Sequence, residues 1–165
     1  MPSWKYVRKE MISSMRSLDN PLILREIIMD HYQNPRNHGI VDEEGYKKVN
    51  MNSETCIDNI DVEVKMNNDI IEDIRFDGEA CAISTASTSI MTELVKGKSV
   101  EEAKNIHQQY MNMIFEKDYD EDLLEEAIAF KNTHKQANRI KCATIGWNAL
   151  EELISSKEGE YYERR

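Results

Sequence analysis

Residues 60–76, IDVEVKMNNDIIEDIRF, contain the pattern that decides the fold. In the first half of this stretch every second residue is apolar, which predicts a half-buried strand because successive side chains of a strand point to opposite faces. Residues 67–69, Asn-Asn-Asp, are typical of a turn. After the turn, the apolar residues Ile70, Ile74 and Phe76 alternate with Ile71, Asp73 and Arg75. We therefore expect a second strand that folds back on the first as an antiparallel hairpin.

The chain before the hairpin predicts one helix and one more strand. Asn20 and Pro21 favour a helix start, since Asn is a preferred N-cap and Pro suits the first helical position. Asn34 and Pro35 end this helix, because the residue before a proline is disfavoured in helical geometry. Residues 47–51 are consistent with a third strand of the same sheet.

The chain after the hairpin changes to helical spacing, with apolar residues three and four apart. Ser99 and Glu102 form a capping-box pattern at the start of one of these helices, and Asp120 is positioned to cap another. The predicted helical spans are 83–94, 100–114, 123–128 and 140–154. Strands followed by helices favour an α+β fold, which we expect to be a small antiparallel three-stranded sheet packed against four or five helices.

Length, composition and charge limit the class of protein. The chain has 165 residues, of which 40% are hydrophobic and 32% charged, so we expect one globular domain. We place this domain at 20–156, between an amino-terminal extension at 1–19 and a charged tail at 157–165. The net charge of −10 disfavours nucleic acid as a partner. No apolar run approaches the ~20 residues of a membrane helix, so we expect no membrane partner and a cytoplasmic protein.

The three cysteines all fall where one predicted element gives way to another. Cys56 precedes the first hairpin strand, Cys81 follows the second, and Cys142 lies early in the last helix. An odd number of cysteines argues against a disulfide framework. A lone cysteine is often just a small buried hydrophobe. Because no C-x-x-C pair marks a zinc site, the spacing alone leaves that alternative open beside metal binding.

Asp58, two residues after Cys56, completes a possible set of four ligands. Three thiolates and one carboxylate match the tetrahedral coordination that Zn²⁺ prefers, and soft thiolates favour zinc or iron–sulfur chemistry over Mg²⁺ or Ca²⁺. Such a set stays negative with zinc bound, so nearby cations would support it. Lys141 and Arg139 are the candidates for this supporting charge.

Three segments, in this order, resemble motifs of one family. They are 30–37 (DHYQNPRN), 78–84 (GEACAIS) and 139–143 (RIKCA). Over about residues 22–153 the chain is similar to the iron–sulfur cluster assembly scaffold family of the IscU and NifU N-terminal type. It looks most like the zinc-dependent SufU branch, because Lys141 precedes the third cysteine where the IscU type has a histidine. Residues 134–138 also lack the chaperone-docking motif of the IscU type.

The resemblance implies a function and a role for each residue of the site. It implies that Cys56, Asp58, Cys81 and Cys142 hold Zn²⁺, and that Cys56 accepts persulfide sulfur from a SufS-like cysteine desulfurase. Downstream cluster-assembly or sulfur-acceptor proteins would take the sulfur. The alternative is a scaffold on which a [2Fe–2S] cluster is assembled on the same ligands, with iron bound. The chain would then be a scaffold without enzymatic activity rather than a zinc-dependent sulfurtransferase.

The first cysteine motif departs from the family pattern, which usually reads Asn-Pro-x-Cys-Gly-Asp. Residues 53–58 read Ser-Glu-Thr-Cys-Ile-Asp, so the cysteine and aspartate remain while Ile57 replaces the glycine. A β-branched residue restricts the backbone more than glycine does. We therefore expect a stiffer or differently shaped loop around Cys56. A further alternative is that the chain is a family member that has kept only a binding or structural role. A zinc hydrolase is disfavoured, since the H-x-E and P-C-x-x-C pattern of zinc deaminases is absent.

Other polar and aromatic residues are assigned structural roles. We interpret the four histidines as surface or packing residues, Trp147 as part of the core, and the acidic stretch 116–126 as a solvated helix face.

Overall fold

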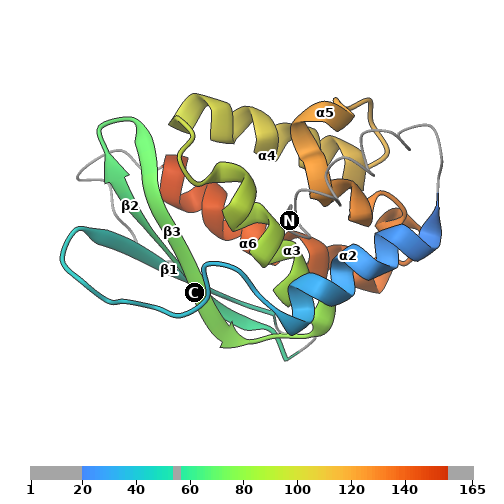
Figure 1. The fold of residues 1–165 in the computed structure, drawn as a ribbon, viewed down its shortest axis with the longest axis horizontal. Helices are drawn as coiled ribbons and strands as arrows, with labels where there is room; N and C mark the ends of the chain where they lie inside the picture. The colour runs from blue at the N-terminus through green and yellow to red at the C-terminus, as the bar shows by residue number, and fades with distance from the viewer. Residues whose placement is uncertain (1–19, 54–56, 156–165) are drawn as a thin grey trace, which may run out of the picture.

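The structure, a computed structural model, describes residues 20–53 and 57–155. The predicted extension at 1–19, the tail at 157–165 and Cys56 lie outside these residues, and the domain boundary at 20–156 stays a prediction. The elements are α2 (Pro21–Gln33), β1 (Tyr46–Asn52), β2 (Asn59–Asn67), β3 (Ile70–Glu79), α3 (Ala82–Val95), α4 (Val100–Ile114), α5 (Glu121–Leu124), the 3-10 helices Glu125–Phe130 and Thr133–Lys135, and α6 (Ala137–Ser155). Figure 1 shows the three strands on one side of the molecule and the helices on the other.

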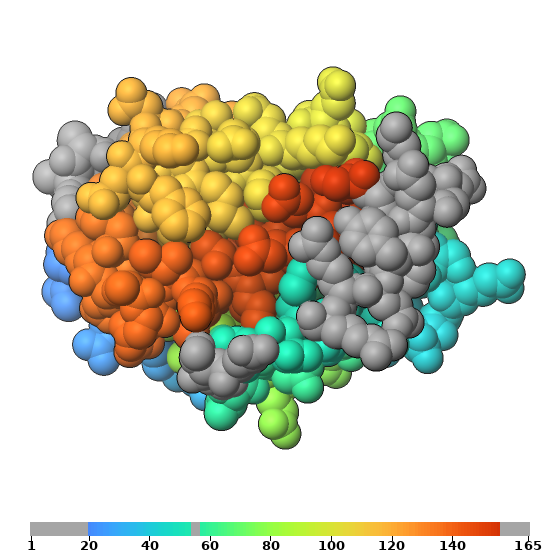
Figure 2. Space-filling model, turned by 180° about the vertical axis from the view of Figure 1, so that it is seen from behind, coloured from blue at the N-terminus to red at the C-terminus, as the bar shows by residue number. Residues whose placement is uncertain are grey.

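The three strands form one antiparallel sheet in the order β1-β2-β3. The hairpin and the third strand are confirmed, as is the α+β class. One face of the sheet is covered by α6, which packs on β1 and β2, and by α3, which packs on β3. Seen from behind, α6 reaches the surface between α4 and β1 (Figure 2).

At the start of the second strand, the prediction of which residues face the core is wrong. The register pairs Lys65 with Asp73 but Met66 with Ile71, so Glu72 is an extra residue in β3 and forms a bulge. The bulge shifts the alternation by one residue at this end of the strand. Ile71 is consequently fully buried, whereas Ile70 is 42% exposed. The alternation from Ile74 to Phe76 lies beyond the bulge and follows the prediction.

The helix ends follow the capping signals in the sequence. The Asn20 side chain accepts a hydrogen bond from the Leu22 N–H, and both hydrogen bonds of the Ser99–Glu102 capping box are present. Asp120 caps α5 as expected. The predicted helix through residue 128 is not continuous, however, because the backbone turns at Glu125, whose φ is +44°, and goes on as a 3-10 helix.

The core between the helices is organised around Trp147. Its ring is fully buried and stacks on Tyr110 with 4.0 Å between ring centroids. The Ser87 hydroxyl receives a hydrogen bond from the Trp147 indole N–H at 3.1 Å and donates to the Ala143 carbonyl at 2.6 Å. The interpretation of Trp147 as a core residue is confirmed.

His31 is a buried packing residue that joins three elements. Its Nδ1 lies 2.7 Å from Ser89 Oγ on α3, and its Nε2 lies 3.0 Å from Glu126 Oε2 in the first 3-10 helix. The backbone N–H of Arg36 donates to the same Ser89 oxygen. Glu126 is 9% exposed. The interpretation of 116–126 as a solvated face is therefore wrong for Glu126, whose carboxylate is buried against His31.

Candidate metal centre

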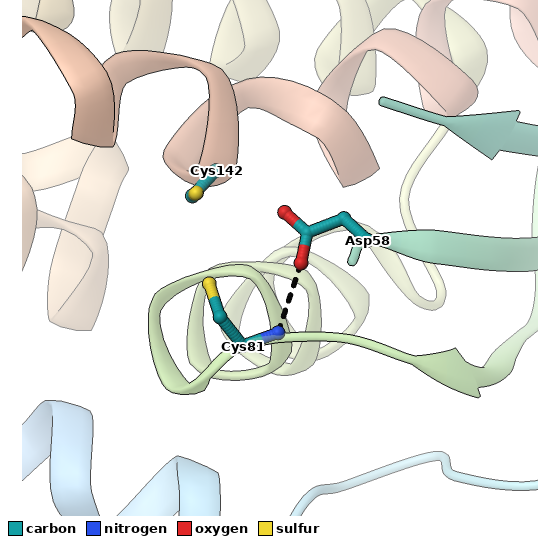
Figure 3. A group of neighbouring side chains, drawn as sticks. All are labelled: Asp58, Cys81 and Cys142. Atoms are coloured by element: carbon teal, nitrogen blue, oxygen red, sulfur yellow. Dashed lines mark hydrogen bonds between the residues drawn. The ribbon is translucent and has the colours of Figure 1, made fainter. Parts of the chain in front are cut away.

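Three potential ligands come together at one end of the sheet. Asp58 directly precedes β2, Cys81 is the N-cap of α3, and Cys142 lies on the second turn of α6. One ligand atom of each lies within 4.8 Å of the other two. Figure 3 shows the three side chains pointing toward a common centre from these three elements.

The strand ends place Asp58 and Cys81 beside each other. Asn59, the first residue of β2, pairs with Asn52 of β1 and with Glu79 of β3. The Ser53 N–H donates to the Asp58 carbonyl at 3.0 Å, which closes the connection between β1 and β2. Cys56 lies in this connection and outside the described residues, so its place in the site stays a prediction.

Gly78 allows the close approach of β3 to β2 next to the site. Its φ is +134°, a region that residues with a side chain rarely adopt. A Cβ at this position would overlap the Asn59 carbonyl oxygen and lie 3.0 Å from the Ile60 Cα. The glycine of the second motif thus sets the backbone path that leads from β3 into Cys81.

Asp58 is a buried carboxylate with hydrogen bonds to both oxygens. It is 1% exposed. Oδ1 accepts from the Cys81 N–H at 2.9 Å, and Oδ2 accepts a short hydrogen bond from the Ser84 hydroxyl. A buried charge needs such partners, because its desolvation is otherwise costly. The aspartate is therefore held in place by α3 before any metal binds.

Ser84 is a residue of the site that the sequence analysis missed. It is fully buried, its N–H donates to Cys81 Sγ at 3.4 Å, and its Oγ lies 3.3 Å from the same sulfur. A signal for it exists in the sequence. Cys81 caps a helix, and a residue three positions after an N-cap returns to face the capping side chain.

The environments of Cys81 and Cys142 differ. Cys81 is partly exposed and lies at the N-cap of α3. Cys142 is buried. Desolvation, reinforced by the hydrogen bond and negative charge of Cys81 and by the charge of Asp58, raises the pKa of Cys142 to about 12. This thiol is protonated at neutral pH, and a metal must displace its proton.

Arg139 and Lys141 are exposed residues of the first turns of α6, close in sequence to Cys142. Their predicted role as supporting charge stays a prediction.

The three described groups suit a thiophilic metal. Two sulfurs and one carboxylate oxygen are ligands that Zn²⁺ and iron–sulfur clusters accept. Sulfur atoms on a tetrahedral zinc, each about 2.3 Å from it, lie about 3.8 Å apart. Atoms that already lie within 4.8 Å of one another reach this spacing by small side-chain movements. The fold and the cluster define a small α+β domain with a candidate zinc or iron–sulfur site.

Comparison with known proteins agrees with this class. The profile of the NifU-like N terminal domain matches residues 23–161. The chain is 42% identical over 138 residues to the zinc-dependent sulfurtransferase SufU of Bacillus subtilis, covering 83% of this chain and 92% of that protein. It is 42% identical over 129 residues to the iron-sulfur cluster assembly scaffold protein IscU of Streptococcus pyogenes, covering 78% of this chain and 80% of that one.

A solved structure shares the fold as well. The crystal structure of the putative scaffold protein for the SUF system from Fervidobacterium islandicum superposes with a TM-score of 0.70 and 33% sequence identity, covering 76% of this chain and 92% of that one. The chain belongs to the NifU-like N-terminal domain family, and the resemblance to the IscU and SufU proteins is confirmed. None of the helices in the described ranges has the length and apolar character needed to cross a membrane.

Proposed function

We propose that this chain is an iron–sulfur cluster assembly protein that binds zinc and accepts persulfide sulfur from a cysteine desulfurase. The observation that carries the proposal is the cluster of buried Asp58 and Cys142 with partly exposed Cys81, whose ligand atoms lie within 4.8 Å of one another. The name of the Bacillus subtilis relative, a zinc-dependent sulfurtransferase, supports the zinc and sulfur-transfer parts. A cytoplasmic location and a SufS-like partner belong to the same proposal.

Cys56 is the proposed sulfur acceptor, and the other three residues are proposed to hold the metal with it. Bound zinc would supply a positive charge that keeps the cysteines as thiolates. The Cys56 thiolate attacks the outer sulfur of the persulfide on the desulfurase. A new S–S bond forms on Cys56, the old S–S bond breaks, and the desulfurase cysteine leaves as a thiolate. Cys56 then carries the persulfide to a downstream acceptor.

Metal analysis of the purified protein together with a desulfurase assay tests the proposal. We expect about one zinc per chain and faster sulfide or alanine release by a cognate desulfurase when the protein is added. Cys56→Ala should abolish the stimulation, whereas Ile57→Ala, which alters the exposed neighbour, should retain it. Full stimulation by the Cys56→Ala protein would refute the role of Cys56 as acceptor.

A scaffold function is the second candidate, and the 42% identity to the Streptococcus pyogenes scaffold protein favours it. In this case a [2Fe–2S] cluster would be built as a product on the same ligands, without turnover by this chain. Anaerobic reconstitution with iron and sulfide separates the two functions. A stable visible chromophore that is lost in Cys142→Ala supports scaffolding, and its absence in the unaltered protein argues against it.

A further inference from the structure

We infer that Ser84 is a positioning residue of the metal centre, whose buried hydroxyl holds the Asp58 carboxylate where it can ligate the metal. The inference rests on the zinc site of the proposed function and adds to it a residue that is not itself a ligand. The Ser84 hydroxyl bonds Asp58 Oδ2 and lies 3.3 Å from Cys81 Sγ, and it also interacts with the Cys142 thiol.

The position of the Ser84 hydroxyl is fixed by the helix that carries it. Ser84 is the third residue of α3, and its N–H donates to the Cys81 sulfur at the N-cap. The side chain is fully buried, so packing restricts its rotamer. The hydroxyl therefore has a defined position relative to Cys81. Its hydrogen bond to Oδ2 fixes the position of the Asp58 carboxylate in turn.

Ser84 gives Asp58 a donor on its second carboxylate oxygen. Its Oδ1 accepts from the Cys81 N–H. A carboxylate with a single donor can still turn about that hydrogen bond, whereas donors to both oxygens fix the plane of the group. A carboxylate oxygen has two lone pairs, so the hydrogen bond from Ser84 does not by itself prevent Oδ2 from ligating a metal. Removal of the Ser84 hydroxyl would leave Oδ2 without this donor in a buried site.

The effect on the metal should be large enough to measure. Outer-shell partners that orient ligating residues typically change metal affinity by about 10- to 100-fold. We expect zinc binding by Ser84→Ala to weaken by about this factor, in competition with a chromophoric chelator. Ser89→Ala is the matched control, because it removes an equally buried hydroxyl from the same helix that bonds His31 instead. It should leave zinc affinity within about 2-fold of the unaltered protein, well below the range expected for a lost outer-shell donor.

A double-mutant cycle with Asp58→Ala tests whether Ser84 acts through the aspartate. If it does, Ser84→Ala has little further effect on zinc affinity once Asp58 is gone. The ligand-field absorption of the Co²⁺-substituted protein gives a second readout, and it should shift in Ser84→Ala but stay unchanged in Ser89→Ala. Equal losses of affinity in both backgrounds, or unaltered affinity in Ser84→Ala, would overturn the inference.

The outcomes also separate this inference from the proposed function. If the unaltered protein binds no zinc, the proposed function fails; if it binds zinc and Ser84→Ala binds it equally well, the role of Ser84 fails alone. Should Ser84→Ala not fold, because a buried carboxylate has lost one of its hydrogen-bond donors, the Asp58→Ala/Ser84→Ala protein should fold again. A double variant that remains unfolded contradicts the pairing.

Discussion

Asp58 and Ile57 are neighbours with opposite burial. The carboxylate is 1% exposed, whereas the apolar side chain of Ile57 is 69% exposed. The usual preference for apolar residues inside is reversed here because α3 offers hydrogen-bond donors to the carboxylate. Isoleucine in place of the family's glycine thus adds an apolar side chain at the surface beside the site. Its effect on the loop around Cys56 stays a prediction.

Tyr46 provides a pH-dependent test of a single hydrogen bond away from the metal centre. Its hydroxyl donates to Asp73 Oδ2 at 2.6 Å, and the Lys96 ammonium lies 3.2 Å from Oδ1. Partial burial raises the pKa of Asp73, but the Tyr46 hydrogen bond and Lys96 outweigh it and hold the pKa below its usual range. The same hydrogen bond raises the pKa of Tyr46 to about 12.

We expect Tyr46→Phe to lower the free energy of unfolding by about 1 kcal/mol near neutral pH. A lowered carboxyl pKa gives stability that is present above the unfolded value of about 3.9 and is lost as pH falls through the folded value. The difference between the two proteins should therefore shrink below about pH 4, and also as pH rises from about 10 to about 12. Urea denaturation across pH measures it, with the exposed Tyr32→Phe as control; a pH-independent difference would contradict the prediction.

At the scale of elements, α3 and α6 determine the distance between the two cysteines. Gly146 of α6 lies against Thr88 of α3 so closely that a Cβ at position 146 would overlap the Thr88 hydroxyl and lie 2.9 Å from its Cβ and Cγ2. Thr88 is one turn after Ser84, and Gly146 is one turn after Cys142. The contact therefore fixes the spacing of the helices next to the candidate metal ligands.

Gly146→Ala should push the helices apart and weaken both folding and metal binding. We expect an overpacking cost of about 1–3 kcal/mol, partly offset by about 1 kcal/mol of improved helix propensity. Zinc affinity should fall in parallel. Thr88→Ala in the same chain should recover part of both losses, and Asn148→Ala, at an exposed position of α6, should cause neither. Chemical denaturation and chelator competition measure the two effects; an unchanged zinc affinity would show that the spacing is not critical.

Features specified by interactions between residues close in sequence could be predicted, whereas features that depend on distant residues could not. Capping signals such as Asn20 and the Ser99–Glu102 box are local, and α2 and α4 begin where these signals indicate, whereas α6, predicted from residue 140, begins at Ala137. The burial of Ile71 instead of Ile70 depends on a bulge that only the pairing of two strands reveals. Glu126 is buried by His31, 95 residues away in sequence. The candidate ligands were visible as residue types, and the helix cap relates Ser84 to Cys81, but the contact of Ser84 with Asp58 forms only when α3 packs beside the start of β2.

At the scale of the whole molecule, the three described candidate ligands come from distant parts of the chain, at positions 58, 81 and 142. A metal bound to all three would connect the sheet, α3 and α6. Such binding stabilises the folded state by an amount that depends on free metal concentration, about 4 kcal/mol at 1,000 times the dissociation constant.

Removal of zinc should therefore lower the thermal midpoint of unfolding, and added zinc should restore it. Differential scanning calorimetry of the protein before and after chelation measures the shift. A Cys81→Ala/Cys142→Ala variant serves as control, because its midpoint should not respond to chelator. A midpoint that is equal with and without metal in the unaltered protein would favour a member retained as a structural or binding protein, with no structural zinc.

The order of the ligands along the chain has a consequence for biosynthesis. Asp58 and Cys81 leave the ribosome well before Cys142, which lies on α6, the last described helix. A growing chain that ends before residue 142 lacks one sulfur ligand, and a chain in which α6 has not docked keeps that ligand away from the other two. If the site binds zinc as proposed, full-strength binding requires that synthesis has passed residue 142 and that α6 has docked, so a chain truncated before Cys142 or misfolded would bind zinc weakly.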